Sequence, residues 1–171
     1  KRGTRLGPLG ERPYGRVARY QPIIGPVHTQ ESHMDSFPKI REYMDTTVPT
    51  LMPETQIMDA VDFLLSQKVT GAPVVDSNGK LIGIVTETDL LKLLAEGIQG
   101  EPPTKATVAE FMTTDVITVP PEVDIYYVAG MFLANKFRRL PIVEDGNIVG
   151  AITRYDLLRV VRTLSSHPAV Q

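Results

Sequence analysis

Two stretches of the chain carry the apolar spacing of an amphipathic helix. In the first, apolar residues follow the steps i, i+3, i+4, i+7 and i+8: Ile57, Ala60, Val61, Leu64 and Leu65. In the second, the same steps recur: Ile125, Val128, Ala129, Phe132 and Leu133. This spacing places the apolar side chains along one face of a helix. The pattern therefore predicts two equivalent helices, each with one buried face.

Short apolar segments typical of strands follow each of these helices. Segments 72–75 and 81–85 flank the turn residues Asp-Ser-Asn-Gly, and 140–143 and 148–152 flank Glu-Asp-Gly-Asn. An extended piece is expected before each helix, at 48–51 and 116–119. A second helix is expected to close each unit, at 89–96 and 156–164. The predicted order is strand, helix, strand, strand, helix, and it occurs twice.

The two units are copies of one sequence. The segment GIVTETDLL, which begins at Gly83, returns as GAITRYDLL from Gly150, about 67 residues later. The copies are expected to cover 39–97 and 107–164, joined by a linker at 98–106. A basic arm rich in glycine and proline (1–38) precedes them, and a short tail (165–171) follows. Because each copy alone is small, the two are expected to share one core.

The amino-acid composition excludes several kinds of catalytic and metal-binding chemistry. The chain has no cysteine, which excludes disulfides, thiol catalysis and cysteine-ligated metals. Its three histidines are too dispersed for a metal set, and the sequence shows no nucleophile–base pair, so the protein is expected not to be an enzyme. The arm is basic and the body acidic. No apolar run approaches the ~18 residues of a membrane span, so a cytoplasmic protein is expected.

The duplicated motifs resemble the CBS (cystathionine β-synthase) domain. The first copy has Met44, Thr46 and Val48, then APVVD from Ala72, then the GIVTETD segment. The second copy matches with three corresponding groups: Met112, Thr114 and Val116, RLPIV from Arg139, and the GAITRYD segment. In this order and in duplicate, the chain resembles a small stand-alone CBS pair, or Bateman module. The arm lies outside the resemblance.

The resemblance implies a fold and a function. It implies an α+β fold in which two βαββα repeats pack sheet to sheet about a pseudo-two-fold axis, with two clefts between them. Such clefts commonly bind AMP, ADP, ATP or S-adenosylmethionine, and the modules often pair into disk-like homodimers. A regulatory sensor of an adenine nucleotide is therefore expected, without catalysis and with an unidentified protein effector.

The Thr-x-x-Asp motifs allow two interpretations. Thr86 with Asp89, and Thr153 with Asp156, are typical of a capping box, in which both side chains satisfy backbone N–H groups at the start of a helix. The resemblance implies a second task, in which the aspartate binds the ribose hydroxyls and the threonine touches ribose or phosphate. A carboxylate has about four acceptor positions, so both interpretations can hold.

Other candidate binding residues follow from the resemblance and from charge. The first set, in repeat 1, comprises Thr46, Val48, Thr70, Gly71, Ala72 and Pro73. The second set, in repeat 2, comprises Thr114, Val116, Arg138, Arg139, Leu140, Pro141 and Arg154. The arginines suit a phosphate, whereas the first copy has Glu87 where the second has Arg154. We therefore expect a phosphorylated ligand in the cleft of Asp156, and a weaker, empty or less charged site at Asp89.

Alternatives remain open at this point. Gly83 and Gly150 suit either a strand bulge or the close approach of backbone to a flat ligand. The arginines suit surface ion pairs as well as phosphate. For the whole chain, the alternatives are a dimerisation scaffold with empty clefts and a nucleic-acid-associated factor that acts through the basic arm.

Overall fold

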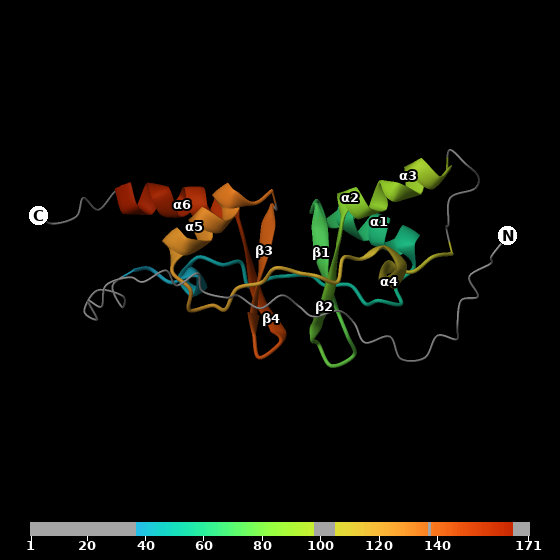
Figure 1. Cartoon of the computed structure of the whole chain (residues 1–171), viewed down its shortest axis with the longest axis horizontal. Helices are drawn as coiled ribbons and strands as arrows, with labels where there is room; N and C mark the ends of the chain where they lie inside the picture. Colours follow the sequence, from blue (N-terminus) through green and yellow to red (C-terminus); the bar gives the residue numbers. More distant parts are fainter. Residues whose placement is uncertain (1–36, 98–104, 137, 166–171) are drawn as a thin grey trace, which may run out of the picture.

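The computed structural model describes residues 37–97, 105–136 and 138–165. Within these ranges the two repeats lie side by side, with their sheets at the centre and their helices on the two outer sides (Figure 1). Residues 1–36 of the arm, residues 98–104 of the linker and residues 166–171 of the tail lie outside the described residues, and so do His28, His33 and His167.

The first repeat contains a two-stranded antiparallel sheet and three helices. Its elements are α1 (Ile57–Gln67), β1 (Gly71–Val75), β2 (Leu81–Thr86), α2 (Glu87–Leu90) and α3 (Lys92–Gly97). The second repeat follows the same plan. Its elements are α4 (Val108–Phe111), α5 (Ile125–Ala134), β3 (Arg139–Glu144), β4 (Asn147–Thr153) and α6 (Arg154–Ser165). A bulge interrupts each sheet at matching positions, beside Gly83 and Gly150.

Three predicted elements differ from the structure. The extended pieces at 48–51 and 116–119 form isolated bridges in place of strands, including parallel bridges from Leu51 to Val74 and from Val119 to Ile142. Nearby prolines lack the N–H that a longer ladder needs. The helix predicted over 89–96 is divided at Leu91 into α2 and α3, although Leu91 keeps helical backbone angles. No proline or glycine marks that break in the sequence.

The leading segment of each repeat packs in the core of the other. Ile40, in a 3₁₀ turn at Ile40–Glu42, is fully buried among second-repeat residues, and its backbone N–H donates to Val123. Val108 is equally buried in the first-repeat core, and its N–H donates to Thr55. Burial of a branched apolar side chain contributes about 1.5–3 kcal/mol. The exchange therefore ties the two repeats into one body.

The motif glycines make room for this exchange. A Cβ built on Gly83 would lie 2.7 Å from Sδ of Met112, and one on Gly150 would lie 2.6 Å from Sδ of Met44. Real Cβ atoms essentially never come that close to another heavy atom. Each glycine sits beside a bulge, as one interpretation predicted, and the space over it is filled by a methionine of the other repeat.

The hairpins of the two repeats also meet. Lys80 bridges to Asn147, the N–H of Leu81 donates to the carbonyl of Gly146 at 3.1 Å, and Nζ of Lys80 donates to the carbonyl of Asp145. Figure 1 shows the β1–β2 and β3–β4 turns on the same side of the molecule. Among the described residues, no helix is long and apolar enough to cross a membrane. The cytoplasmic location stays a prediction.

Candidate functional site

Both Thr-x-x-Asp motifs form capping boxes. In the first, the N–H and the hydroxyl of Thr86 donate to Oδ2 of Asp89 at 3.0 and 2.7 Å, and the N–H of Asp89 donates back to Oγ1 of Thr86. Thr153 and Asp156 repeat the arrangement at 2.8 and 2.6 Å. The capping interpretation is confirmed. The ribose-binding role stays a prediction.

The two aspartates differ in their second oxygen. Oδ1 of the buried Asp89 accepts from Nζ of Lys92 at 3.1 Å, whereas Oδ1 of Asp156 lies 4.0 Å from Arg159. The Asp89 carboxylate therefore has three of its about four acceptor positions in use and retains one for a further donor.

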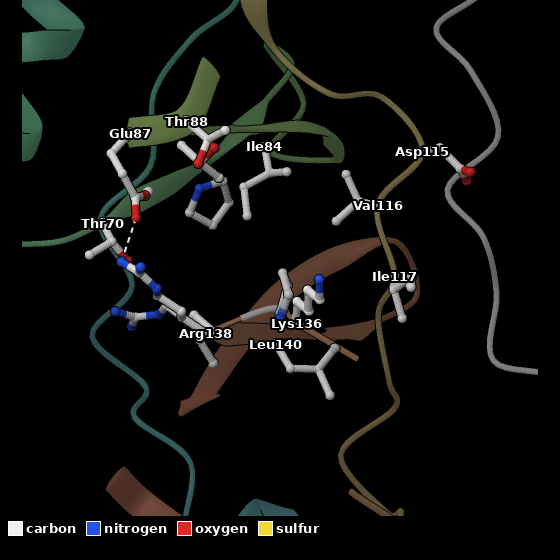
Figure 2. A pocket seen from close by; sticks show the side chains of 16 residues that line it. Thr70, Ile84, Glu87, Thr88, Asp115, Val116, Ile117, Lys136, Arg138 and Leu140 are labelled. Atoms are coloured by element: carbon white, nitrogen blue, oxygen red, sulfur yellow. Dashed lines mark hydrogen bonds and ion pairs between the residues drawn. The ribbon is translucent and has the colours of Figure 1, made fainter. Parts of the chain in front are cut away.

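A cavity of about 380 Å³ lies between the repeats beside Thr86; we call it the Thr86 cleft (Figure 2). Residues of both repeats line it: Thr70, Gly71, Pro73, Ile84, Thr86, Glu87, Thr88, Asp115, Val116, Ile117, Lys136, Arg138, Arg139, Leu140, Pro141 and Ala151. This volume falls within the range of small-molecule sites.

The exchanged segment brings second-repeat residues into this cleft. Thr113 bridges to Ile84 in β2, and Val119 bridges to Ile142 in β3. Residues 115–117 therefore cross from one sheet to the other. Figure 2 shows Val116 and Ile117 on this crossing segment, with Ile84 and Leu140 approaching from the two sheets. Facing apolar side chains of this kind form a slot suited to a flat ring.

The structure brings expected site residues of the second repeat together with those of the first repeat in one cavity. Val116, Leu140 and the two arginines were expected in the cleft of Asp156, but they line the cavity beside Thr86. The physical reason is the segment exchange, which carries the chain after Met112 along the edge of the first repeat's sheet. Arg138 and Arg139 therefore line the Thr86 cleft. Their expected role in the cleft of Asp156 stays a prediction.

Both arginines of the cleft are paired with carboxylates. Nη1 of Arg138 donates to Oε1 of Glu87 at 2.6 Å (Figure 2), and Nη2 of Arg139 donates to Oδ2 of Asp45 at 3.2 Å. Both contacts are therefore surface ion pairs of the kind that the sequence indicated as the alternative to phosphate binding. Among the described residues, the buried Nε of Arg139 has no hydrogen-bond partner. A buried donor without a partner costs about 1–3 kcal/mol.

Eight expected residues do not line this cavity. Ala72 is core, Asp89 lies behind its cap, and the exposed Arg154 donates to the carbonyl of Asn135 at 3.2 Å. The others are Thr46, Val48, Thr114, Thr153 and Asp156. Asp45 bridges to Ala151 in β4, so the chain that follows it, with Thr46 and Val48, runs beside the second repeat's Thr-x-x-Asp motif. They correspond to the crossing segment of the Thr86 cleft.

Sequence reasoning missed several lining residues. Thr88 belongs to the same turn as Thr86, while Asp115 and Ile117 flank Val116. Adjacency to a motif was the available signal for these three. Ile84 and Ala151 follow the motif glycines directly, so the same signal applied to them, whereas Lys136 reaches the cavity through the packing of the repeats.

Comparison with known proteins identifies the class. The CBS domain family model matches twice, over residues 40–96 and 108–163. The chain belongs to the CBS domain family and contains a CBS pair.

The structural neighbours are CBS pairs. CBSX2 of Arabidopsis thaliana superposes with a TM-score of 0.69 at 29% identity, covering 78% of this chain and 100% of that one. CBSX2 in complex with AMP gives a TM-score of 0.66 at 31% identity, with 74% and 98% covered. The CBS pair of MJ0100, in complex with 5-methylthioadenosine and S-adenosyl-L-methionine, gives 0.63 at 29% identity, with 72% and 99% covered.

The curated relatives are mostly longer. The uncharacterized protein MJ1225 of Methanocaldococcus jannaschii is 34% identical over 71% of this chain, which spans 42% of its length. An inosine-5'-monophosphate dehydrogenase of Nitrosopumilus maritimus is 38% identical over 61% of this chain, which spans 20% of its length. The chain thus corresponds to a minor part of each of these two proteins.

Proposed function

We propose that this CBS pair is a regulatory module that binds an adenosine ligand of the AMP, ADP or ATP class, or S-adenosylmethionine, in the Thr86 cleft. The observation that carries the proposal is the 380 Å³ cavity between the repeats, with apolar walls from both. Ile84, Val116 and Leu140 suit the faces of adenine, and backbone groups of the same segments suit its edge. AMP in CBSX2 and methylthioadenosine in MJ0100 support the ligand class.

The charges of the cleft favour a phosphate position near its arginines. Arg138, Arg139 and Lys136 line one part of the cavity, and guanidinium groups bind phosphate with paired hydrogen bonds. The buried Nε of Arg139, which lacks a partner among the described residues, adds a donor at the same place. Asp89 and Thr86 would bind the ribose. This proposal reverses the expected asymmetry between the two clefts.

Regulation would act through the packing of the repeats. A ligand in the Thr86 cleft touches β2, β3 and the crossing segment 115–117 together. The two repeats would have two alternative packings, and the ligand would stabilise the one that it binds more tightly. The shift in free energy between the packings equals at most the difference in the ligand's binding free energy for them. The output passes to an unidentified protein effector. The module has no catalytic role in this scheme.

A second copy of the chain is the proposed assembly partner. Exposed apolar side chains recur at equivalent positions on the outer helices of both repeats: Leu65 and Leu133, Leu91 and Leu158, Leu94 and Val161. Leu133 is 90% exposed. A patch that repeats about an internal two-fold axis suits a symmetric homodimer, in which each copy covers the same patch of the other.

Thermal unfolding with AMP, ADP, ATP and S-adenosylmethionine tests the proposed binding. A ligand at a hundred times its Kd that binds only the folded state adds about 2.7 kcal/mol. This stabilisation raises Tm by several degrees for a chain of this size. A rise with at least one ligand supports the proposal, and no rise with any of the four contradicts it.

A further inference from the structure

An ion pair joins the two repeats at the Thr86 cleft. Glu87 is the first residue of α2 in the first repeat, and Arg138 immediately precedes β3 in the second. Nη1 of Arg138 lies 2.6 Å from Oε1 of Glu87, with the side chains 68% and 39% exposed. Both residues line the cavity (Figure 2). A guanidinium that is suited to a ligand phosphate is therefore already held by a carboxylate.

The Glu87–Arg138 ion pair has no counterpart at the equivalent positions of the other repeat. The residue equivalent to Glu87 is Arg154, which donates to a backbone carbonyl, and the residue equivalent to Arg138 is Thr70. The duplicated motif therefore does not require Glu87. Asp115 adds a second acid to the lining, in contrast to Lys136 and the arginines.

We propose that Glu87 determines the charge specificity of the Thr86 cleft by competing with ligand phosphate for Arg138. This inference rests on the proposed function. A neutral adenosine leaves the Glu87–Arg138 pair intact. A phosphorylated ligand must displace Glu87 from Arg138 and then lies beside the released carboxylate, and the repulsion grows with ligand charge. The cleft therefore favours adenosine compounds of low negative charge over nucleoside polyphosphates.

Isothermal titration with adenosine, AMP, ADP and ATP tests the inference. In Glu87→Gln, we expect unchanged affinity for adenosine, about threefold tighter binding of AMP and about tenfold tighter binding of ATP, as expected for one exposed unit charge at close range. Glu54→Gln is the matched control, because it removes the same charge from an exposed residue outside the cleft. It should reproduce the wild-type affinities.

A double-mutant cycle with Arg138→Gln separates competition from general repulsion. If Glu87 acts by occupying Arg138, the gain from Glu87→Gln shrinks to less than twofold for AMP when Arg138 is absent. If adenosine or AMP binds but Glu87→Gln does not change the order of affinities, this inference is wrong and the proposed function stands. An undiminished gain in the Arg138→Gln background also overturns it. Absence of binding by all four compounds overturns this inference, and absence of S-adenosylmethionine binding as well overturns the proposed function.

Discussion

Met112 of the second repeat packs directly on Gly83 of the first. A Cβ on Gly83 would lie 2.7 Å from Sδ of Met112 and 3.1 Å from the carbonyl oxygen of Thr113. The N–H of Thr113 donates to the carbonyl of Ile84 at 2.8 Å, and the N–H of Ile84 donates to the carbonyl of Thr113 at 2.9 Å. This contact anchors the crossing segment, and the crossing segment brings Val116 into the Thr86 cleft. Gly83 therefore supports the cleft indirectly, because it leaves room for Met112 and so for the crossing segment.

Substitution of Gly83 by alanine should destabilise the fold. The methyl group must displace Met112 and a backbone carbonyl, and overpacking of this kind costs about 1–3 kcal/mol. Urea denaturation gives the free energy of unfolding. Adding Met112→Ala should recover part of the loss, because residues in contact show non-additive effects. Strict additivity of the two changes would contradict the contact.

Much of the fold follows from the sequence. The helical spacing from Ile57 and from Ile125 predicts α1 and α5, and the turn residues predict both hairpins. These features are local, so a period or a turn signal reveals them. The capping boxes of Asp89 and Asp156 are local as well, and the structure confirms them.

The composition of the cleft does not follow from the sequence. The binding residues of each cleft were expected to come mainly from one repeat, but Val116 and Arg138 of the second repeat line the cavity beside Thr86 of the first. No local pattern encodes which repeat receives Ile40 or Val108, because either core could bury an apolar side chain of that size. The Glu87–Arg138 pair is hidden for the same reason: its residues lie 51 positions apart in the chain.

The first hairpin should lose stability in acid. Hydrogen bonding from the backbone N–H of Lys80 lowers the pKa of Asp76 below its usual 3.8, opposed by desolvation and assisted by the backbone N–H of Asn78. A lowered folded-state pKa stabilises the fold above the unfolded-state pKa, and this contribution disappears as pH falls through the folded-state pKa.

The comparison of wild type with Asp76→Asn isolates this contribution. Their difference in unfolding free energy should be constant near pH 7 and decrease below about pH 4, where the carboxylate becomes protonated. Denaturation in urea at each pH measures it. A difference that does not change with pH would show that the charge of Asp76 contributes nothing.

The exposed leucines should mediate self-association. Leu133→Lys introduces a charge into the repeated patch, and a buried unpaired charge disfavours an interface strongly. Sedimentation velocity should show a dimer for wild type and a monomer for the variant. Met52→Lys is the control, because Met52 is exposed but lies outside the helices. A wild-type monomer, or a Leu133→Lys dimer, would contradict the proposed assembly.

The two capping aspartates should differ in their effect on AMP binding. Asp89→Ala and Asp156→Ala each remove one capping box, at a similar cost of about 1 kcal/mol. Only Asp89 adjoins the Thr86 cleft through its cap. We therefore expect about a tenfold loss of AMP affinity for Asp89→Ala, since a hydrogen bond to a charged group contributes about 1.5–3 kcal/mol, and little loss for Asp156→Ala. Equal losses in calorimetry would argue against the asymmetry.

A crystal structure of the protein grown with saturating AMP tests the central proposal most directly. We expect electron density for adenine between Ile84, Val116 and Leu140, with the phosphate toward Arg138. Density confined to the neighbourhood of Thr153, or no nucleotide density in the Thr86 cleft, would contradict it.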